Sequence, residues 1–345
     1  MPKKSTLRLK RFIKVFLFLF LIIAIGLWYF LLGKNTGDMH KGNFLYIPNG
    51  SNYEQVLELL KTNGFIENKT SFDLLAKRTD YHNRVKAGKY KIEPGMSNLT
   101  IIRILRSGKQ TPVKLIINKI RTKQEFISKI SAQLEVNTDS MKQLLSNNEY
   151  LSKFQLDSNT SLAAIMPDTY EFWWNTKAEK VFEKIAANYK NFWNANRLES
   201  AKKLELSPTQ VITLASIVEE ETNDITEKDL IASVYLNRLR KGMKLQADPT
   251  AKYAFGDFTI KRITSTQTQI PSPYNTYYVM GLPPGPICTP SKSSIDAVLK
   301  GTATSYLYFC AKADFSGSHS FANDYASHMI NAKKFQEAMN LRNIR

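Results

Sequence analysis

The sequence predicts an α+β protein in three parts: a single N-terminal transmembrane helix, a small β/α module and a larger mixed α+β domain. Three observations support this prediction. Residues 15–32 contain no charged side chain and follow a basic tail at residues 1–14. Beyond residue 42, short strand-like stretches are interspersed with capped helical patterns. The 345 residues are enough for about two or three domains.

The apolar run at residues 15–32 is expected to be a membrane anchor. At about 1.5 Å per residue, a helix of this length extends roughly 27 Å, enough to cross the hydrocarbon core of a bilayer. A cleaved signal peptide is the alternative, but its apolar part is typically about 7–15 residues long, and Gly33, Lys34 and Asn35 offer no small-residue cleavage site. The positive-inside rule predicts a cytoplasmic N-terminus, with residues 34–345 outside the cytoplasmic (inner) membrane.

The net charge of the chain indicates which classes of partner it can bind. Lys and Arg total 48 against 30 Asp and Glu, which gives +18, and the basic tail at residues 1–14 carries six of these charges. The remaining +12 (18 − 6) belongs to the part expected outside the cytoplasm, where anionic lipids and an anionic cell wall attract basic proteins. A nucleic-acid-binding protein is the alternative, but only charge supports it, because the sequence contains no DNA- or RNA-binding motif.

Composition and motifs exclude several kinds of chemistry. Two cysteines cannot form a disulfide framework, and four scattered histidines have no metal-ligand spacing, so neither a metal nor a cofactor is expected. The sequence contains no glycine-rich phosphate loop and no G-x-S-x-G nucleophile elbow. Whether Cys288 and Cys310 pair stays open, although Cys310 lies in an apolar strand-like stretch and is expected in the core.

A polar linker at residues 33–42 precedes a compact module predicted at residues 43–118. The expected order is β-α-α-β-α, with a strand at 44–48, helices at 51–60 and 71–77, a strand and a Pro-Gly turn within 87–97, and a helix at 99–107. Ser51 and Ser97 are predicted to be helix N-caps, and Gly108 follows the last helix. Such a unit suits wall binding; a spacer without a ligand is the alternative.

The larger domain is predicted at residues 119–345, after a strand at residues 113–118. Its helices are expected at 123–134, 139–146, 178–195, 208–221, 227–241, 293–300 and 324–340, with a hairpin at 305–321. Ser207 and Gln210 form a predicted capping box in front of a helix that is apolar on almost all sides and is therefore expected to be buried. Thr226 is the predicted cap of the following helix.

Glu219 is the candidate acid. It follows Ala215 by one turn and Ile212 by two, so its carboxylate falls on a helix face of apolar or small side chains. Glu221 points about 200° away from it. A carboxylate against apolar neighbours is desolvated, which raises its pKa and suits a general acid near neutral pH. The alternative is that residues 219–221 are simply the solvated end of a helix.

A Pro- and Gly-rich loop at residues 270–290 is a second candidate feature. Tyr274 and Asn275 place an aromatic face beside an amide group, as carbohydrate sites often do, although a rigid surface loop is the alternative. Gln246 and Asp248 follow the helix at 227–241 and are predicted to face the same cleft.

Several separate motifs, in the same order, resemble the YceG-like (MltG-type) endolytic murein transglycosylases. They are L-A-S-I-V-E-E-E-T at 214–222, N-R-L at 237–239, G-M-K-L-Q-A-D-P-T at 242–250, S-P-Y-N-T-Y at 272–277, G-L-P-P-G-P-I at 281–287 and H-S-F at 319–321. P-D-T-Y at 167–170 extends the resemblance, and A-G-K-Y-K-I-E-P-G-M-S at 87–97 resembles part of the family's LysM-like module. The sequence departs from the family at S-L-A-A-I-M before P-D-T-Y, and at 289–291, where T-P-S replaces the usual Pro-Gly.

The resemblance implies a lytic transglycosylase that cleaves nascent glycan strands between MurNAc and GlcNAc without water. The product carries a 1,6-anhydro-MurNAc end, and strand elongation stops. Ordinary glycosidases need two carboxylates. Here the sugar's own 6-hydroxyl is the nucleophile, so one Glu can act first as acid and then as base. The motif match implies Glu219 as the catalytic residue and the following substrate-binding residues: Glu221, Gln246, Asp248, Tyr274, Asn275 and His319.

The expected partners are peptidoglycan strands and the membrane, with peptidoglycan synthases as a further candidate. A catalytically silent, membrane-anchored peptidoglycan-binding scaffold is the alternative function.

Overall fold

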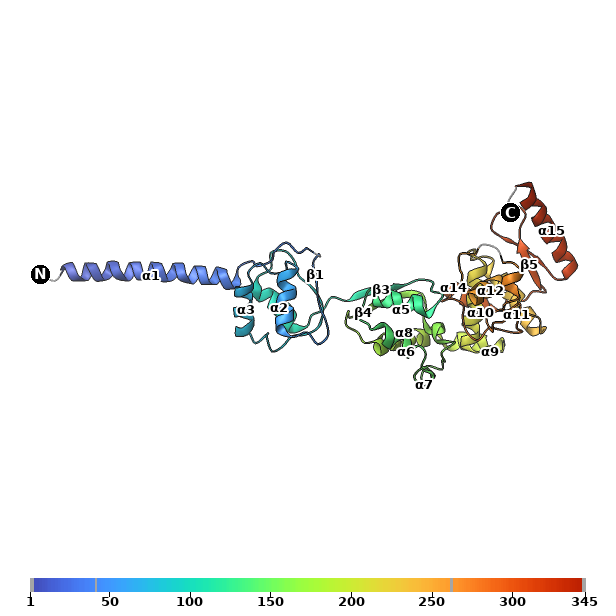
Figure 1. Ribbon diagram of the computed structural model, residues 1–345, viewed down its shortest axis with the longest axis horizontal. Coiled ribbons are helices and arrows are strands. Elements are labelled where there is room, and N and C mark those ends of the chain that lie inside the picture. Colours follow the sequence, from blue (N-terminus) through green and yellow to red (C-terminus); the bar gives the residue numbers. More distant parts are fainter. Residues whose placement is uncertain (1–2, 41, 261–262, 343–345) are drawn as a thin grey trace. The chain divides into compact units, whose positions relative to one another are not determined.

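The computed structural model describes residues 3–40, 42–260 and 263–342, and the chain divides into two compact units (Figure 1). The first unit is Met1–Val113 with Glu171–Thr176, and the second is Lys114–Tyr170 with Lys177–Arg345. Both units combine helices with short strands, which agrees with the predicted α+β class at this coarse level.

The first unit contains an antiparallel strand pair and a helical core. Its elements are α1 (Lys3–Leu32), β1 (Phe44–Ile47), α2 (Tyr53–Thr62), α3 (Lys69–Arg78), β2 (Gly88–Lys91) and α4 (Asn98–Ser107). Leu45 of β1 lies opposite Tyr90 of β2, and both side chains are buried in the unit's core. Helix α1 is long and apolar enough over Leu9–Leu32 to cross a membrane, and its side chains there are largely exposed.

Helix capping in the first unit follows the predictions at one end and differs at another. Ser97 caps α4, and Gly108 ends it in the left-handed region at φ +75°, as expected. The prediction of Ser51 as the cap of α2 is wrong. Asn52 caps this helix instead: its side chain accepts the Gln55 amide at 2.9 Å, and the Gln55 side chain accepts the Asn52 amide at 2.9 Å.

The second unit holds the longer series of elements. They are β3 (Val113–Ile117), α5 (Lys123–Ser131), α6 (Thr138–Leu144), α7 (Asn148–Ser152), a 3-10 turn (Ser161–Ala164), β4 (Asp168–Phe172), α8 (Ala178–Phe192), α9 (Ala195–Lys203), α10 (Pro208–Glu221), α11 (Lys228–Arg240), α12 (Asp248–Phe255), α13 (Ser265–Thr268), α14 (Lys292–Lys300), β5 (Tyr308–Ala311), β6 (His319–Ala322) and α15 (Tyr325–Leu341). β3 pairs with β4, and β5 pairs with β6. Val113 of β3 and residues 171–172 of β4 belong to the first unit.

Helix α10 is the buried centre of this unit. Ser207 and Gln210 form the predicted capping box, and every side chain from residue 211 to residue 218 is buried. α10 packs against α11, α12 and α14 (Figure 1). The prediction of Thr226 as the cap of α11 is wrong: α11 begins at Lys228, and the Thr226 hydroxyl donates to Asp224 at 2.8 Å. The packing of α10 among these helices sets the directions of the three acids at its C-terminal end.

The C-terminal hairpin and helix complete the second unit. β5 and β6 are antiparallel, with Ala311 opposite His319, and α15 packs against β5 and β6. Asp324 caps α15, where its carboxylate accepts the Ser327 amide at 2.8 Å.

Candidate active site

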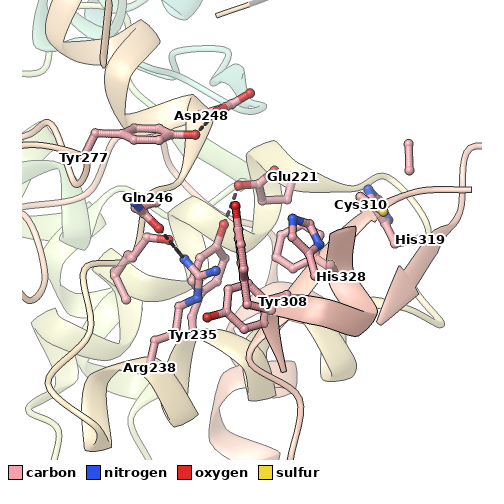
Figure 2. A pocket seen from close by; sticks show the side chains of 14 residues that line it. Glu221, Tyr235, Arg238, Gln246, Asp248, Tyr277, Tyr308, Cys310, His319 and His328 are labelled. Carbon is pink, nitrogen blue, oxygen red and sulfur yellow. Dashed lines mark hydrogen bonds between the residues drawn. The ribbon is translucent and has the colours of Figure 1, made fainter. Parts of the chain in front are cut away.

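A cavity of about 420 Å³ opens in the second unit, beside the C-terminal end of α10 (Figure 2). It is lined from α10, α11, the segment before α12, both hairpin strands and α15. Four of the seven predicted site residues line it together: Glu221, Gln246, Asp248 and His319. Glu219, Tyr274 and Asn275 are not among the lining residues.

The three consecutive acids of α10 occupy three different environments. Glu219 faces Lys228 of α11. Glu220 accepts two hydrogen bonds from the guanidinium of Arg121, at 3.1 and 2.9 Å, and forms a second ion pair with a lysine. Glu221 lines the cavity. Because successive helical residues are about 100° apart, three neighbours on one helix cannot share one environment.

Glu221 has the electrostatics of a general acid. Burial raises its pKa to about 7, and the nearby charge of Asp248 acts in the same direction. The phenol of Tyr235 opposes the rise, because it donates a 2.5 Å hydrogen bond to Glu221 Oε1 and so favours the charged form. The carboxyl group is therefore available in its protonated form near neutral pH, which proton donation to a leaving group requires.

The expectation of a raised pKa at Glu219 is wrong. Burial does raise it, but hydrogen bonds from the hydroxyls of Ser291 and Ser294, each 2.5 Å from Oε2, and the ammonium of Lys228 at 2.9 Å outweigh burial. The pKa of Glu219 consequently lies below its ordinary value. The face of α10 that carries Glu219 is apolar, but residues from α14, its N-cap and α11 place polar groups beside the carboxylate of Glu219. Ser291 belongs to the T-P-S departure from the family pattern.

Asp248 and Gln246 lie on the cavity wall formed by the segment before α12. Tyr277 donates to Asp248 Oδ1 at 2.6 Å. Gln246 adopts φ +49°, in the left-handed region, and its amide donates to the carbonyl of Thr276 at 3.1 Å. The loop at residues 270–290 thus holds this wall in place through its backbone and Tyr277.

Asn275 and Tyr274 brace the loop instead of facing the cavity. Asn275 is fully buried, and its side-chain amide donates to the carbonyls of Gln267, Thr268 and Ile270 at 3.1, 3.1 and 2.9 Å. The Tyr274 ring packs against Tyr253, with centroids 4.8 Å apart. Aromatic and amide groups in a turn-rich loop are as suitable for bracing the loop as for binding a sugar, and the sequence does not separate these two uses.

His319 is held by a buried carboxylate. Its backbone amide donates to Glu227 Oε1 at 2.7 Å, and its ring Nδ1 lies 2.8 Å from Glu227 Oε2. Since an ionised carboxylate only accepts, a neutral His319 ring in this contact has its proton on Nδ1 and its acceptor at Nε2. Glu227 was not a predicted site residue, because nothing in its local pattern points to a residue 92 positions later.

Three further residues of the cavity, Arg238, Tyr308 and His328, were not predicted from the sequence. Arg238 donates to the carbonyls of Leu307 and Leu245, both at 2.7 Å, and its guanidinium lies 5.1 Å from the centre of the Tyr308 ring. Tyr308 in turn stacks on His328, with centroids 5.2 Å apart and planes 21° apart. Figure 2 shows these side chains around the space near Glu221. The N-R-L motif was the one available signal, and only for Arg238.

The two cysteines are both free. Cys288 is buried, whereas Cys310 lines the cavity and is half-buried, so the expectation of a core position for Cys310 is wrong. Among the residues that the structure describes, no group of three or more His, Cys, Asp or Glu side chains has the arrangement of a metal site.

Comparison with known proteins places the chain in a family. The sequence model of the YceG-like family matches residues 45–334. This chain belongs to the YceG-like family. An endolytic murein transglycosylase from Bacillus subtilis (strain 168) is 30% identical over 288 residues, which cover 78% of each chain. A protein of the same description from Streptococcus pneumoniae serotype 2 is 26% identical over 82% of this chain, which spans 56% of that longer relative.

A solved structure gives the same result. The crystal structure of a yceG-like protein from Listeria monocytogenes superimposes on this YceG-like chain with a TM-score of 0.57 and 27% identity. The match covers 83% of this chain and 97% of the Listeria chain.

Proposed function

We propose that this YceG-like chain is an endolytic murein transglycosylase, a lyase that cuts peptidoglycan glycan strands between MurNAc and GlcNAc without water. Family membership and the relatives described as endolytic murein transglycosylases support this activity. The observation that carries the chemistry is Glu221, a carboxyl group with a pKa of about 7 on the wall of a cavity lined by polar and aromatic side chains.

Glu221 is the proposed acid in place of Glu219. A protonated Glu221 gives its proton to the glycosidic oxygen as the bond from MurNAc C1 to that oxygen breaks. The 6-hydroxyl oxygen of the same MurNAc then bonds to C1 and closes the 1,6-anhydro ring. Glu219 is poorly suited to the first step, because its lowered pKa keeps it charged at neutral pH and Lys228, Ser291 and Ser294 already occupy Oε2.

The cavity supplies side chains suited to a polysaccharide. Tyr308 and His328 form a stacked aromatic wall on which a sugar ring can lie. Gln246, Asp248 and Arg238 provide hydrogen-bonding groups on the other walls. Asp248, Gln246 and His319 therefore remain proposed substrate-binding residues, whereas Tyr274 and Asn275 are proposed to support the loop.

The first unit is proposed to hold the enzyme at the membrane and against the wall. α1 would anchor the chain in the cytoplasmic membrane with its basic end inside, and cleavage close to the membrane would reach nascent strands and end their elongation. Residues 43–118 are the proposed LysM-like module. A groove of about 630 Å³ there includes the polar residues Ser51, Gln55 and Asn63, which can form hydrogen bonds with a glycan. Peptidoglycan synthases are proposed as neighbours at this site of synthesis.

Two matched variants test the assignment of the acid. The full chain in detergent is incubated with purified glycan strands, and the products are analysed by mass spectrometry. Wild type should release fragments with anhydro ends, which are one water lighter than hydrolysis products. Glu221→Gln should abolish this release, while folded Glu219→Gln should retain it. The reverse result would return the role to Glu219, and products carrying an added water would contradict the lyase.

The alternative function, a catalytically silent peptidoglycan-binding scaffold, predicts a different result. It requires wild type to bind glycan strands and to release no fragment, under conditions in which a known lytic transglycosylase is active.

A further inference from the structure

We propose that His319, oriented by Glu227, is the base that removes the proton from the 6-hydroxyl of MurNAc while Glu221 acts as the acid. This inference rests on the proposed transglycosylase activity and assigns its second proton transfer, which a single carboxylate would otherwise perform alone. His319 is thereby a catalytic residue and Glu227 a positioning residue.

The contact between Glu227 and His319 fixes both the place and the tautomer of the imidazole. One carboxylate oxygen accepts the His319 backbone amide at 2.7 Å, and the other lies 2.8 Å from Nδ1. The two side chains are only 14% and 10% exposed for His319 and Glu227. A ring held at Nδ1 by a buried carboxylate has Nε2 free as an acceptor, and the carboxylate stabilises the imidazolium that forms when Nε2 takes a proton.

His319 and Glu221 lie on the same cavity and come from different elements. Glu221 ends α10, whereas His319 begins β6 of the hairpin, and both line the space shown in Figure 2. This separation suits a reaction in which the leaving oxygen and the attacking hydroxyl are different atoms of the substrate. An acid on one element and a base on another allow both proton transfers without a turn of one side chain between them.

The proposed step balances. Glu221 loses a proton to the glycosidic oxygen, and the bond from MurNAc C1 to that oxygen breaks with its electron pair on the oxygen. The 6-hydroxyl oxygen forms a bond to C1 and gives its proton to His319 Nε2. The products are a new 4-hydroxyl end and a 1,6-anhydro end. The enzyme is left with a Glu221 carboxylate and a His319 imidazolium, and proton exchange with solvent restores the starting state.

Other titratable groups around the cavity are less suited to this step. Asp248 already accepts the Tyr277 phenol, and Arg238 carries no acceptor. Among the residues that the structure describes, none forms a hydrogen bond with the buried Nδ1 atom of His328, so no carboxylate orients its ring through that atom. Glu227 contacts Nδ1 of the His319 ring, and the titratable or charged groups that line the cavity with His319 are Glu221, Tyr235, Arg238, Asp248, Tyr277, Tyr308, Cys310, Tyr325 and His328.

His319→Asn is the main test, because an Asn side-chain amide can still donate to Glu227 but has nothing in the place of Nε2. With the full chain and purified glycan strands, we expect kcat to fall by about 10²–10⁴-fold with KM little changed. Because a base must be unprotonated to accept a proton, the wild-type profile of kcat/KM should fall on the acidic side as well as on the alkaline side. The residual activity of His319→Asn should lack this acidic fall. Glu227→Gln should lower kcat as well, since the imidazolium loses its counter-charge.

The controls distinguish a catalytic base from a residue that only stabilises the fold. His40→Asn changes an exposed histidine of the first unit and should leave kcat and the pH profile unchanged. Folding of each variant is followed by thermal melting, and imidazole added to folded His319→Ala should restore part of the lost rate. Unchanged kcat in His319→Asn, a persistent acidic fall, or no restoration by imidazole would overturn the proposal. Wild type without anhydro products would instead refute the activity itself.

Discussion

Glu219 and Glu221 lie two residues apart at the end of α10, yet their carboxylates have opposite electrostatics. Glu219 Oε2 accepts from Lys228 and two serine hydroxyls, which keep it charged. Glu221 is half-buried beside Tyr235, and desolvation raises its pKa to about 7. The half-turn between the two residues directs one to an internal ion pair and the other to the cavity. This difference decides which carboxyl group can donate a proton at neutral pH.

Replacement of Tyr235 by Phe should move the alkaline side of the pH profile. The phenol favours the charged form of Glu221, so its removal raises the pKa of Glu221 above about 7. In the proposed reaction Glu221 acts in its protonated form, so activity should be lost as pH rises through this pKa. The midpoint of the alkaline fall in kcat/KM should therefore lie at higher pH in Tyr235→Phe. Tyr278→Phe, at an exposed position outside the cavity, is the matched control.

Glu221→Gln should change stability in a pH-dependent manner. The pKa of Glu221 is higher in the folded chain than in the unfolded chain, so its contribution is fully present below pH about 4.5 and is lost as pH rises through about 7. The neutral amide avoids this loss. We expect Glu221→Gln to unfold with a free energy about 1–3 kcal/mol above wild type at pH 8, and with little difference at pH 4.5. Urea unfolding at the two pH values measures it; a gain that is equal at both would contradict the raised pKa.

Local signals were predictable from the sequence, and contacts between distant elements were not. Ser207, Gln210 and Ser97 cap helices as expected, because a cap depends on residues within one turn. The apolar period of α10 correctly indicated a buried helix. It could not predict the hydrogen bond that the hydroxyl of Ser291, 72 residues later in the chain, donates to the carboxylate of Glu219. The pKa of a side chain depends on such long-range neighbours, so the apolar period alone led to the expectation of a raised pKa at Glu219, whereas the structure lowers it.

The cavity residues show the same difference between local motifs, which the sequence reveals, and contacts between distant elements, which it does not. Gln246, Asp248 and His319 were found through short motifs, and the structure brings them together. Tyr308 and His328 lie on β5 and α15, and their stacking depends on how the helix packs on the hairpin. No spacing in the sequence reports that packing.

Lys228→Met should destabilise the fold strongly, because it leaves the partly buried carboxylate of Glu219 without its counter-charge. Lys228 is 4% exposed and lies 2.9 Å from Glu219 Oε2. Breaking one side of a buried ion pair typically costs about 3–5 kcal/mol. The double variant Lys228→Met with Glu219→Gln should recover much of this loss, since no unpaired charge remains. Urea unfolding of the three proteins measures both effects; a double variant no more stable than Lys228→Met would contradict the argument.

The ion pair between Glu219 and Lys228 also predicts that the stability of the fold depends on pH in the acidic range. The pKa of Glu219 is lowered in the folded chain, so its contribution is present above the unfolded pKa and is lost as pH falls through the folded one. The stability difference between wild type and Glu219→Gln should therefore shrink as the pH is lowered below about 4.

Tyr308→Ala tests the aromatic wall of the cavity. Its ring lies between the guanidinium of Arg238 and the imidazole of His328, so its removal takes away the surface on which a sugar ring would stack. A loss of about 1.4 kcal/mol in binding corresponds to a roughly tenfold rise in KM for glycan strands. Because Tyr308 does not exchange a proton with the substrate in the proposed reaction, kcat should change less than KM. Tyr278→Ala removes an exposed ring outside the cavity and should change neither. If Tyr308→Ala lowered kcat at constant KM, the ring would act on the transition state and not on binding of the strand.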